Sequence, residues 1–360
     1  MGTSEQGVRW PAEWEPHEAT WIAWPHHEPD WPGKFGPIPW VYAEIVRVLH
    51  RYEPVRILCA NEEVRDSAFR ALTSHGVELG RCELHLVPTD RVWLRDSGPT
   101  GVLREGRLEW VKWRFNAWAK YENYRDDQRV ADRITELSGH RGMRPTRADG
   151  TPLVLEGGGI DGNGSGALLV TEEWLLSDTQ VRNPGMSRAD YEAVFRKYLG
   201  VTETIWLGEG ITGDDTHGHV DDLARFVAAD TVVLAHEEDP SDENHQRTSA
   251  NLERLKRAGE TLTGGLRVVT LPFPMPIVMD GERLPASYAN FYIANGVVLV
   301  PTYNDRADLR ALHILAELFP GRDVVGIHSV DLIWGMGALH CLTQQQPRVG
   351  AIGQDGRDGW

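Results

Sequence analysis

Short apolar runs alternate with amphipathic segments along most of the chain, and this alternation restricts the fold to a mixed α/β class. The runs that predict strands cover residues 55–60, 82–88, 108–115, 167–170, 224–235, 266–272, 295–303 and 324–334. Two helices are predicted from apolar residues that share one helical face. The first face holds Val41, Ile45, Val48, Leu49 and Tyr52, and the second holds Leu309, Leu312, Ala316 and Phe319. Ser187 and Asp190 form an N-cap pattern that predicts a helix over residues 191–199.

Polar or glycine-rich clusters follow several of these predicted strands at nearly regular intervals. They lie at Trp24, Asp96, Glu156, His219, about Asn290, and Cys341, so that successive positions differ by 72, 60, 63, 71 and 51 residues. An internal period of about 60–70 residues suggests modules of a few strands and a helix around an axis, each presenting one cluster to a common centre. Chance spacing of turns is the alternative, because no residue-level self-similarity accompanies the period.

The composition narrows the class of partner. The chain has 360 residues and a formal net charge of −16, so it can bury a substantial core and is expected to bind neither nucleic acid nor an anionic membrane. The charge suits a small cationic substrate, although many proteins are acidic for solubility alone. The N-terminal residues lack an apolar signal core and no apolar run is long enough to span a membrane, so a cytoplasmic location is expected.

The three cysteines, Cys59, Cys82 and Cys341, are too few and too widely spaced for a disulfide framework or a cysteine-based zinc site. Cys341 lies in the stretch GMGALHCLTQQQP, residues 335–347, after a predicted strand. Glycine carries no Cβ and lets the backbone approach a ligand closely, so this thiol is a candidate nucleophile. The alternative is a small buried hydrophobe, which is the usual role of a free cysteine.

The segment DDTHGHVDD, residues 214–222, holds a candidate acid–base pair. His219 and Asp221 are two residues apart and would share one face of a strand, and a histidine beside a carboxylate suits proton transfer near neutral pH. A surface acidic loop is the alternative. A metal site is a third interpretation, since His217 and His219 form an HxH pair close to the His-Glu-Glu-Asp run at 236–239, although neither spacing is diagnostic.

Two further strand ends carry carboxylates, in VWLRDSGP (92–99) and LEGGGID (155–161). Asp96 is a candidate ligand group, although an Arg-Asp pair is most often a structural ion pair. Trp93 would either stack on a planar cation or belong to the core. Glu156 precedes three glycines, where a carboxylate can reach into a crowded site, and an exposed turn is the alternative. No basic residue follows the glycines, so this is not a phosphate loop.

The combination of one thiol, one imidazole and three carboxylates at separate strand ends suits chemistry on a guanidinium. Two carboxylates can grip a guanidinium by bidentate, charge-assisted hydrogen bonds. A thiolate would attack the central carbon, and the histidine would protonate the departing ammonia and then activate water. A Ser/His/Asp hydrolase is less favoured, because the chain has no GxSxG elbow.

Seven segments extend these observations over nearly the whole chain. They are PAEWEPHEATWIAWP (11–25), WLRDSGP (93–99), RFNAWAKY (114–121), EGGG (156–159), GHVDD (218–222), PASYANFYIANGVVLVPTY (285–303) and HCLTQQQP (340–347). Together they resemble the agmatine deiminase and bacterial-type peptidylarginine deiminase family of the pentein superfamily. The resemblance implies a five-module, pseudo-symmetric α/β propeller. Residues 1–360 would then form a single catalytic domain of about five modules, with a loose tail at 354–360.

The resemblance also implies a role for each matched residue. The implied roles are Cys341 as nucleophile, His219 as acid and base, Glu156 as its orienting carboxylate, Asp96 and Asp221 as guanidinium ligands, and Trp93 as a pocket wall. Neither a metal nor another cofactor is implied. The chain departs from the family pattern at His217, where an acidic or amide residue is common, and at Met336 and Ala338, which interrupt the glycine run. These departures bear on substrate identity more than on chemistry.

The expected reaction is hydrolysis of a guanidinium to a ureido group and ammonia through an S-alkylthiouronium intermediate. Agmatine, giving N-carbamoylputrescine, is the favoured substrate because the chain is acidic and lacks an export signal. Arginine, peptidyl-arginine or another guanidino compound is the alternative. A metallohydrolase built on the HxH pair and a silent guanidinium-binding protein are two further hypotheses. The oligomeric state is open, with a homo-oligomer allowed.

Overall fold

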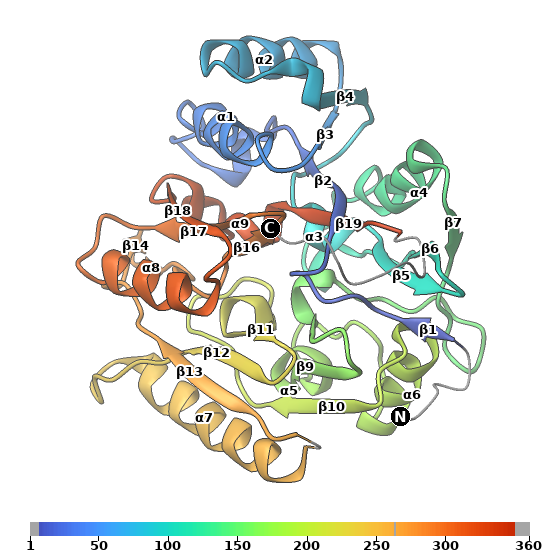
Figure 1. The fold of residues 1–360 in the computed structure, drawn as a ribbon, viewed down its shortest axis with the longest axis vertical. Helices are drawn as coiled ribbons and strands as arrows, with labels where there is room; N and C mark the ends of the chain where they lie inside the picture. Colours follow the sequence, from blue (N-terminus) through green and yellow to red (C-terminus); the bar gives the residue numbers. More distant parts are fainter. Residues whose placement is uncertain (1–6, 263, 350–360) are drawn as a thin grey trace.

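The structure is a computed structural model, and it describes residues 7–262 and 264–349. Five sheets of three or four strands dominate this part of the chain (Figure 1). In spatial order they are β1 (Val8–Arg9), β5 (Thr100–Arg104), β6 (Arg107–Val111), β7 (Arg141–Met143); β10 (Glu203–Leu207), β9 (Ala167–Thr171), β8 (Asp161–Gly162); β11 (Ala224–Ala228), β12 (Thr231–Ala235), β13 (Arg267–Leu271); β16 (Tyr292–Ala294), β17 (Val297–Thr302), β18 (Asp323–His328); and β19 (Gln344–Pro347), β2 (His17–Ala23), β3 (Val55–Cys59), β4 (Cys82–Leu86). A separate hairpin pairs β14 (Val278–Met279) with β15 (Glu282–Arg283).

The helices fall into long and short classes. The longer ones are α1 (Ile38–Leu49), α2 (Glu62–Ser74), α4 (Asp127–Ser138), α6 (Arg188–Leu199), α7 (Glu243–Thr261) and α8 (Ala307–Leu318). The short α-helices are α3 (Leu94–Ser97), α5 (Glu172–Leu176) and α9 (Leu339–Leu342). The 3₁₀ helices are η1 (Glu28–Asp30), η2 (Leu79–Arg81), η3 (Ala117–Ala119), η4 (Gly157–Gly159), η5 (Val220–Asp222) and η6 (Leu332–Gly335).

Each of the five sheets repeats one pattern, an antiparallel strand pair followed by a helix and a parallel strand. The antiparallel pairs are β5–β6, β8–β9, β11–β12, β16–β17 and β19–β2. The parallel partners that follow are β7, β10, β13, β18 and β3. The crossover helices α4, α6, α7, α8 and α1 lie on the outside of the molecule (Figure 1). The predicted five-module α/β architecture is therefore confirmed.

The two ends of the described chain meet in one sheet. Strand β19 pairs antiparallel with β2, with Gln344 opposite Trp21. The Trp21 indole donates to Gln346 Oε1 at 3.0 Å, which fixes the register from a side chain as well as from the backbone. The module that holds the last strand is thus completed by β2, β3 and β4 from the N-terminal quarter of the chain, while β1 joins the sheet of β5.

Helix α6 illustrates how the sequence forms each outer layer. Ser187 and Asp190 form the predicted capping box, and the helix starts at Arg188, three residues before the predicted start. Phe195 and Leu168 of β9 are fully buried in one cluster between helix and sheet. Burial of such a side chain stabilises the fold by about 1.5–3 kcal/mol.

Several sequence predictions need correction. The apolar run 224–235 is a hairpin of β11 and β12, because an exposed turn at Ala229 and Asp230 divides it, and a turn of only two residues is easily read as part of one strand. In α8, Leu309 is 67 % exposed, while Ala311 and Leu315 are buried. Of the predicted face, Phe319 is buried and Leu312 packs against the core, whereas Leu309 and Ala316 are exposed, so the inward face is rotated toward Ala311 and Leu315. The run 324–334 ends as a strand at His328 and continues into η6.

Trp24 does not belong with the other clusters. It is fully buried after β2, in a sheet that already contributes the Cys341 cluster through β19. The predicted tail at 354–360 lies outside the described residues. Among residues 7–262 and 264–349, no helix is long and apolar enough to cross a membrane.

Candidate active site

The candidate residues occupy equivalent places in different modules. Each lies just before the first strand of its module's antiparallel pair, on or beside a single helical turn. Asp96 lies in α3 before β5, and Glu156 and His219 directly precede η4 and η5, before β8 and β11. Cys341 lies in α9 before β19. The sequence period therefore reflects the strand starts of the modules, rather than the strand ends that were predicted.

A cavity of about 340 Å³ opens onto the thiol. Cys341, Asp96 and Trp93 line it directly. Trp118, Tyr121 and Trp334 complete an aromatic wall, and Asp30 and Asp215 add two carboxylates. His219, Glu156 and Asp221 are fully buried and lie behind this lining.

The imidazole of His219 is held from one side by Glu156. The His219 Nε2 atom lies 3.4 Å from Glu156 Oε2, and the same carboxylate accepts from Trp174 Nε1 at 2.7 Å and from Arg182 Nε at 3.2 Å. Burial acts to raise the pKa of Glu156, but Arg182, His219 and Trp174 outweigh it and lower that pKa to about 2. Burial acts to lower the pKa of His219, but Asp96, Glu156 and Asp221 raise it to about 9. His219 is therefore an imidazolium at neutral pH.

Asp96 is fixed by two donors on different modules. Trp118 Nε1 donates to Asp96 Oδ2 at 2.8 Å, and the Gly158 amide donates to Oδ1 at 3.0 Å. Burial, with Asp221 and Glu156 adding to it, raises the pKa of Asp96 to about 6 despite the charge of His219. A bound cation would favour the ionised form of this carboxyl.

Asp221 is held on one oxygen only. His340 Nδ1 lies 2.7 Å from Asp221 Oδ2, and His340 Nε2 lies 2.8 Å from Glu13 Oε2. Burial acts to raise the pKa of Asp221, but the hydrogen bond and charge of His340 and the charges of His219 and Arg225 hold it below its ordinary value. Asp221 is therefore a carboxylate.

The backbone at Gly158 brings three of these groups around one point. A Cβ added there would lie 2.6 Å from His219 Nδ1, 2.9 Å from Asp96 Oδ1 and 3.0 Å from Asp221 Oδ2. Only glycine can pass so close to the three side chains. The predicted role of the glycine run, to let the backbone crowd the site, therefore matches the geometry.

Two polar atoms of this group lack a partner. They are His219 Nδ1 and Asp221 Oδ1, both buried and without a hydrogen bond to the described residues. The nearest oxygen to His219 Nδ1 is Asp96 Oδ1 at 3.8 Å, which is too long for a hydrogen bond. A buried polar atom without a partner is costly, and here a carboxylate oxygen and an imidazolium N–H are both left for a ligand.

The thiol of Cys341 lies among carboxylates. Its Sγ is 3.6 Å from Asp221 Oδ2 and 3.1 Å from Asn290 Nδ2. Burial, together with Asp221, Asp222 and Asp96, raises the pKa of Cys341 well above its ordinary value. The thiol is therefore protonated at neutral pH in the free protein, and an added positive charge or a hydrogen-bond donor at the sulfur would favour the thiolate.

The glycines beside the thiol have a packing role. A Cβ at Gly337 would lie 2.7 Å from the Trp93 ring, and one at Gly335 would lie 2.6 Å from the Trp31 ring. The two indoles lie against each other with centroids 5.8 Å apart. Trp93 thus belongs both to the core and to the cavity wall, which unites the two predicted alternatives.

The departures from the family pattern fall in different places. His217 is not among the residues that line the cavity, and its Nε2 lies 2.9 Å from Ser177 Oγ. It has a φ of 64°, a left-handed conformation in which His, Asn and Asp are all enriched among non-glycine residues. Met336 has a φ of 67° and does line the cavity, so of these two it is the departure that can affect substrate choice.

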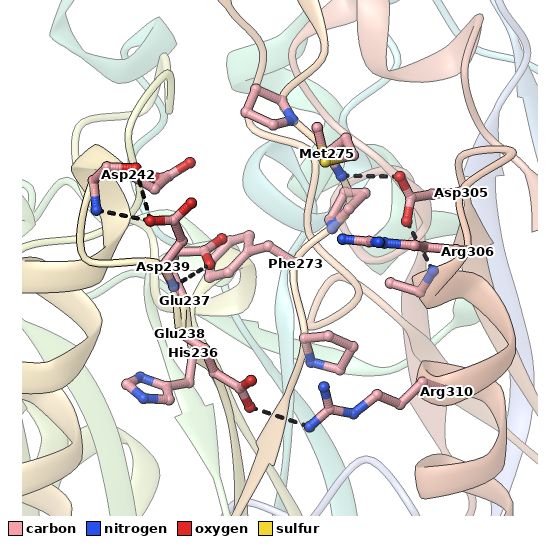
Figure 2. A pocket seen from close by; sticks show the side chains of 15 residues that line it. His236, Glu237, Glu238, Asp239, Asp242, Phe273, Met275, Asp305, Arg306 and Arg310 are labelled. Atoms are coloured by element: carbon pink, nitrogen blue, oxygen red, sulfur yellow. Dashed lines mark hydrogen bonds and ion pairs between the residues drawn. The ribbon is translucent and has the colours of Figure 1, made fainter.

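The predicted metal ligands do not come together. Among residues 7–262 and 264–349, the only group of three ligand atoms within 4.8 Å is that of Asp221, Asp222 and Cys341. His236, Glu238 and Asp239 instead line a separate cleft of about 690 Å³, shown in Figure 2. We call this the outer cleft. Glu238 there pairs with Arg310 at 3.2 Å across the opening.

Sequence reasoning assigned no role to four buried polar residues around the thiol, which are Glu13, Arg225, Asn290 and His340. Asn290 was noted for its spacing, but its contact with Cys341 was not predicted. Glu13 accepts from Ile293 N at 2.8 Å and pairs with Arg225 at 2.9 Å and with His340. His340 adjoins the thiol in sequence, and Glu13 and Asn290 lie in segments that were quoted for the resemblance. A charged or amide residue inside such an apolar segment was the available signal.

Comparison with known proteins agrees with this geometry. The family model for the Porphyromonas-type peptidyl-arginine deiminase matches residues 9–347. The agmatine deiminase of Stutzerimonas stutzeri is 36 % identical over 367 residues, which cover 95 % of this chain and 96 % of that protein.

Solved structures show the same likeness. The agmatine deiminase of Enterococcus faecalis has a TM-score of 0.87 and 30 % identity, covering 96 % of this chain and 97 % of the other. A substrate-bound agmatine deiminase of C. jejuni has a TM-score of 0.85 and 26 % identity, covering 97 % and 98 %. Strand starts from separate modules thus bring a thiol, an imidazolium and carboxylates to one cavity in a fold that these enzymes share, and the chain belongs to the Porphyromonas-type peptidyl-arginine deiminase family.

Proposed function

We propose that the protein hydrolyses agmatine to N-carbamoylputrescine and ammonia, with Cys341 as the nucleophile. The observation that carries the proposal is that a thiol and a carboxylate line one cavity, while a second carboxylate and an unpartnered imidazolium N–H lie beside them behind that lining. This set matches the charge and the planar hydrogen-bond donors of a guanidinium. The named activity of the agmatine deiminases that the chain resembles supports the same reaction.

Substrate binding would activate the thiol. Asp96 and Asp221 accept hydrogen bonds from the guanidinium nitrogens, and the unpartnered Asp221 Oδ1 is free to take one of them. The substrate's positive charge then lies beside Sγ and offsets the carboxylates that disfavour the thiolate. The thiol proton leaves to solvent through the cavity that Cys341 lines.

The chemical steps then follow in two halves. The thiolate forms a C–S bond to the guanidinium carbon, and His219 gives its Nδ1 proton to the departing amino group, which leaves as ammonia. The product of this half is an S-alkylthiouronium ion. Neutral His219 next takes a proton from water as that water attacks the same carbon. The C–S bond breaks, the thiolate leaves, and one proton is lost to solvent as the ureido product forms.

Glu156 would orient the imidazole for both transfers. Its contact to Nε2 leaves Nδ1 as the nitrogen that faces Asp96 and the thiol side of the cavity. The carboxylate also favours the imidazolium, which is the form that the first half requires. Trp93 would line the pocket against the guanidinium plane.

The far part of the cavity favours agmatine over arginine. Arginine would bring a carboxylate, which needs a free cation, but the lining residue Arg91 already pairs with Asp30 at 3.2 Å and donates to Asn123 at 2.9 Å. Asp30 Oδ2 is buried without a partner, whereas the other lining carboxylate, Asp215, already pairs with Lys120 and accepts from the Tyr121 hydroxyl at 2.8 Å. Asp30 and the aromatic wall suit the terminal ammonium and the methylene chain of agmatine.

The remaining proposals concern setting and partners. The reaction as written uses no metal and no other cofactor. We propose a single catalytic domain that includes all five modules, because the site draws on residues from each of them. A cytoplasmic enzyme that acts on a small guanidino substrate, binds no nucleic acid and forms a homo-oligomer is consistent with the acidic chain.

A substrate panel tests the proposal. Purified protein is assayed for ureido product and ammonia with agmatine, arginine, peptidyl-arginine and methylated arginines. We expect agmatine to give the highest kcat/KM. A higher value with another guanidino compound would overturn the substrate, and no ureido product from any of them would overturn the reaction.

A further inference from the structure

Asn290 is the residue of the fourth module that corresponds in position to Asp96, Glu156, His219 and Cys341. It lies two residues before β16, the first strand of its module's antiparallel pair, and it is fully buried. The sequence period passes through it, yet neither the guanidinium ligands nor the proton transfers involve it. A side chain at this position therefore calls for a separate account.

The side-chain amide of Asn290 has all its hydrogen-bonding groups engaged. Its Nδ2 donates to Cys341 Sγ at 3.1 Å and to Asp222 Oδ1 at 2.9 Å. Its Oδ1 accepts from the backbone N–H of His340 at 2.9 Å and, more weakly, from that of Cys341 at 3.4 Å. The backbone donors require an oxygen at Oδ1, so the nitrogen must face the sulfur, and the usual ambiguity of an asparagine amide does not arise.

We propose that Asn290 is a catalytic residue whose amide N–H stabilises the Cys341 thiolate. This assignment rests on the proposed role of Cys341 as nucleophile. Sulfur carries negative charge twice in the reaction, before it attacks the guanidinium carbon and after the C–S bond breaks. A donor fixed 3.1 Å from Sγ assists at both points, because hydrogen bonds to charged atoms are the stronger ones.

A neutral amide suits this place better than a cation would. A lysine or arginine beside the sulfur would favour the thiolate more strongly. It would also repel the guanidinium, because the Asp221 carboxylate that binds the guanidinium lies only 3.6 Å from Sγ. Asp222 holds the second N–H of the same amide, so the donor cannot rotate away from the sulfur. Asp222 is thus a positioning residue for Asn290.

The test separates the donor from the anchoring oxygen. Asn290→Asp keeps Oδ1 but replaces the N–H with a carboxylate charge, whereas Asn290→Ala removes both groups and adds no charge, so loss of the donor is shown only if the midpoint rises in both variants. The rate of Cys341 alkylation by iodoacetamide is measured against pH, which needs no substrate. Cys341→Ala supplies the background from Cys59 and Cys82. We expect Asn290→Asp to move the alkylation midpoint upward by about one pH unit and to lower kcat about tenfold with little change in KM.

Asn251→Asp is the matched control, because Asn251 is also fully buried. Its Oδ1 accepts from Gly208 N and its Nδ2 donates to Glu209 O, on α7 and away from the thiol. This variant should leave the midpoint unchanged. An unchanged midpoint in folded Asn290→Asp, or a raised KM with unchanged kcat, would overturn the donor role.

A second measurement needs no Asn290 variant. In wild-type protein labelled with ¹⁵N-asparagine, one side-chain amide should shift with the same pH midpoint as Cys341 alkylation, and this shift should vanish in Cys341→Ala. If no amide resonance follows that midpoint, the proposal is wrong even where both variants fail to fold. A protein that forms ureido product but fails these tests would retain the proposed function without the Asn290 role.

Discussion

The catalytic cavity and the outer cleft are both lined by carboxylates, and they differ in how those carboxylates are bonded. The outer cleft is larger, about 690 Å³ against about 340 Å³. Its acids are exposed or satisfied: Glu238 pairs with Arg310 (Figure 2), and Asp242 caps α7 and pairs with Arg283 at 2.8 Å. In the catalytic cavity, buried Asp221 keeps an oxygen without a partner. The outer cleft also holds a buried polar atom without a partner, His236 Nδ1, so what distinguishes the cavity beside Cys341 is an unpartnered buried carboxylate oxygen rather than size or acidity.

The largest expected effect is at the thiol. Cys341→Ala should abolish turnover while leaving agmatine binding largely intact, because the carboxylates that grip the guanidinium remain. A steady-state assay measures turnover, and isothermal titration calorimetry measures agmatine binding. Substitution of Cys59 or Cys82 should be kinetically mild, since burial raises their pKa values to about 12 and about 11 and neither lines the cavity. Retention of more than a few per cent of turnover in Cys341→Ala would contradict the covalent mechanism.

The next effect concerns the two guanidinium ligands. Asp96→Asn and Asp221→Asn keep the side-chain shape and remove the charge, so a buried cation is left half-paired at a cost of about 3–5 kcal/mol. We expect kcat/KM to fall about a hundredfold or more. Asp242→Asn in the outer cleft is the matched control, and asparagine caps a helix as well as aspartate does. A near-normal kcat/KM in either folded site variant would remove that residue from the site.

Two histidines should respond to pH with opposite sign. The pKa of His219 is raised from 6.5 to about 9, so its stabilising contribution is complete below pH 6.5 and is lost as the pH rises through 9. The loss amounts to at most about 3 kcal/mol for a fully buried pair. Burial and His245 lower the pKa of His236 in the outer cleft, so its ionisation costs stability as the pH falls through 6.5.

Urea unfolding of the wild type, His219→Asn and His236→Asn between pH 5.5 and 9.5 measures how the free energy of unfolding depends on pH. His219→Asn should flatten the decline above pH 6.5, and His236→Asn should flatten the decline below it. Equal curves for wild type and His219→Asn would mean that His219 is not held as an imidazolium.

The smallest expected effect is that of metal removal. Dialysis against a strong chelator should leave activity unchanged, because the substrate's own charge and two carboxylates polarise the carbon in the proposed reaction. Loss of activity that zinc or manganese restores would favour the metallohydrolase hypothesis instead. His217→Asn is a useful companion variant, since it removes one HxH ligand and suits the left-handed backbone there.

Sequence reasoning selected candidate residues that the structure brings together, because these residues recur at the start of their modules. The spacing of Asp96, Glu156, His219 and Cys341 was visible in the linear chain. The partners of these residues were not, since His340 meets Glu13 across 327 positions and Asn290 meets Cys341 across 51. Such contacts depend on the arrangement of the sheets, which no local pattern encodes.

Helix faces were also harder to predict than helix positions. The structure buries Phe319 of the predicted face together with Ala311 and Leu315, but it leaves Leu309 of the same predicted face exposed. The small Ala311 lets the helix approach β17 and β18 closely. Depth of approach is a tertiary property, and hydrophobic periodicity alone does not record it.

The pairing of β19 with β2 makes the position of the proposed nucleophile depend on contacts between residues near opposite ends of the chain. Trp21 and Gln346 are 325 positions apart, so a growing polypeptide can assemble the modules of His219 and Glu156 long before α9 has a sheet to rest on. Closing so long a loop is slow, although its added entropic cost grows only logarithmically with length. If the chain were cut in a loop between β2 and β19, the thiol would stay in place only while the two fragments remained bound to each other. Recovery of turnover on mixing the two fragments would therefore measure the pairing of β19 with β2.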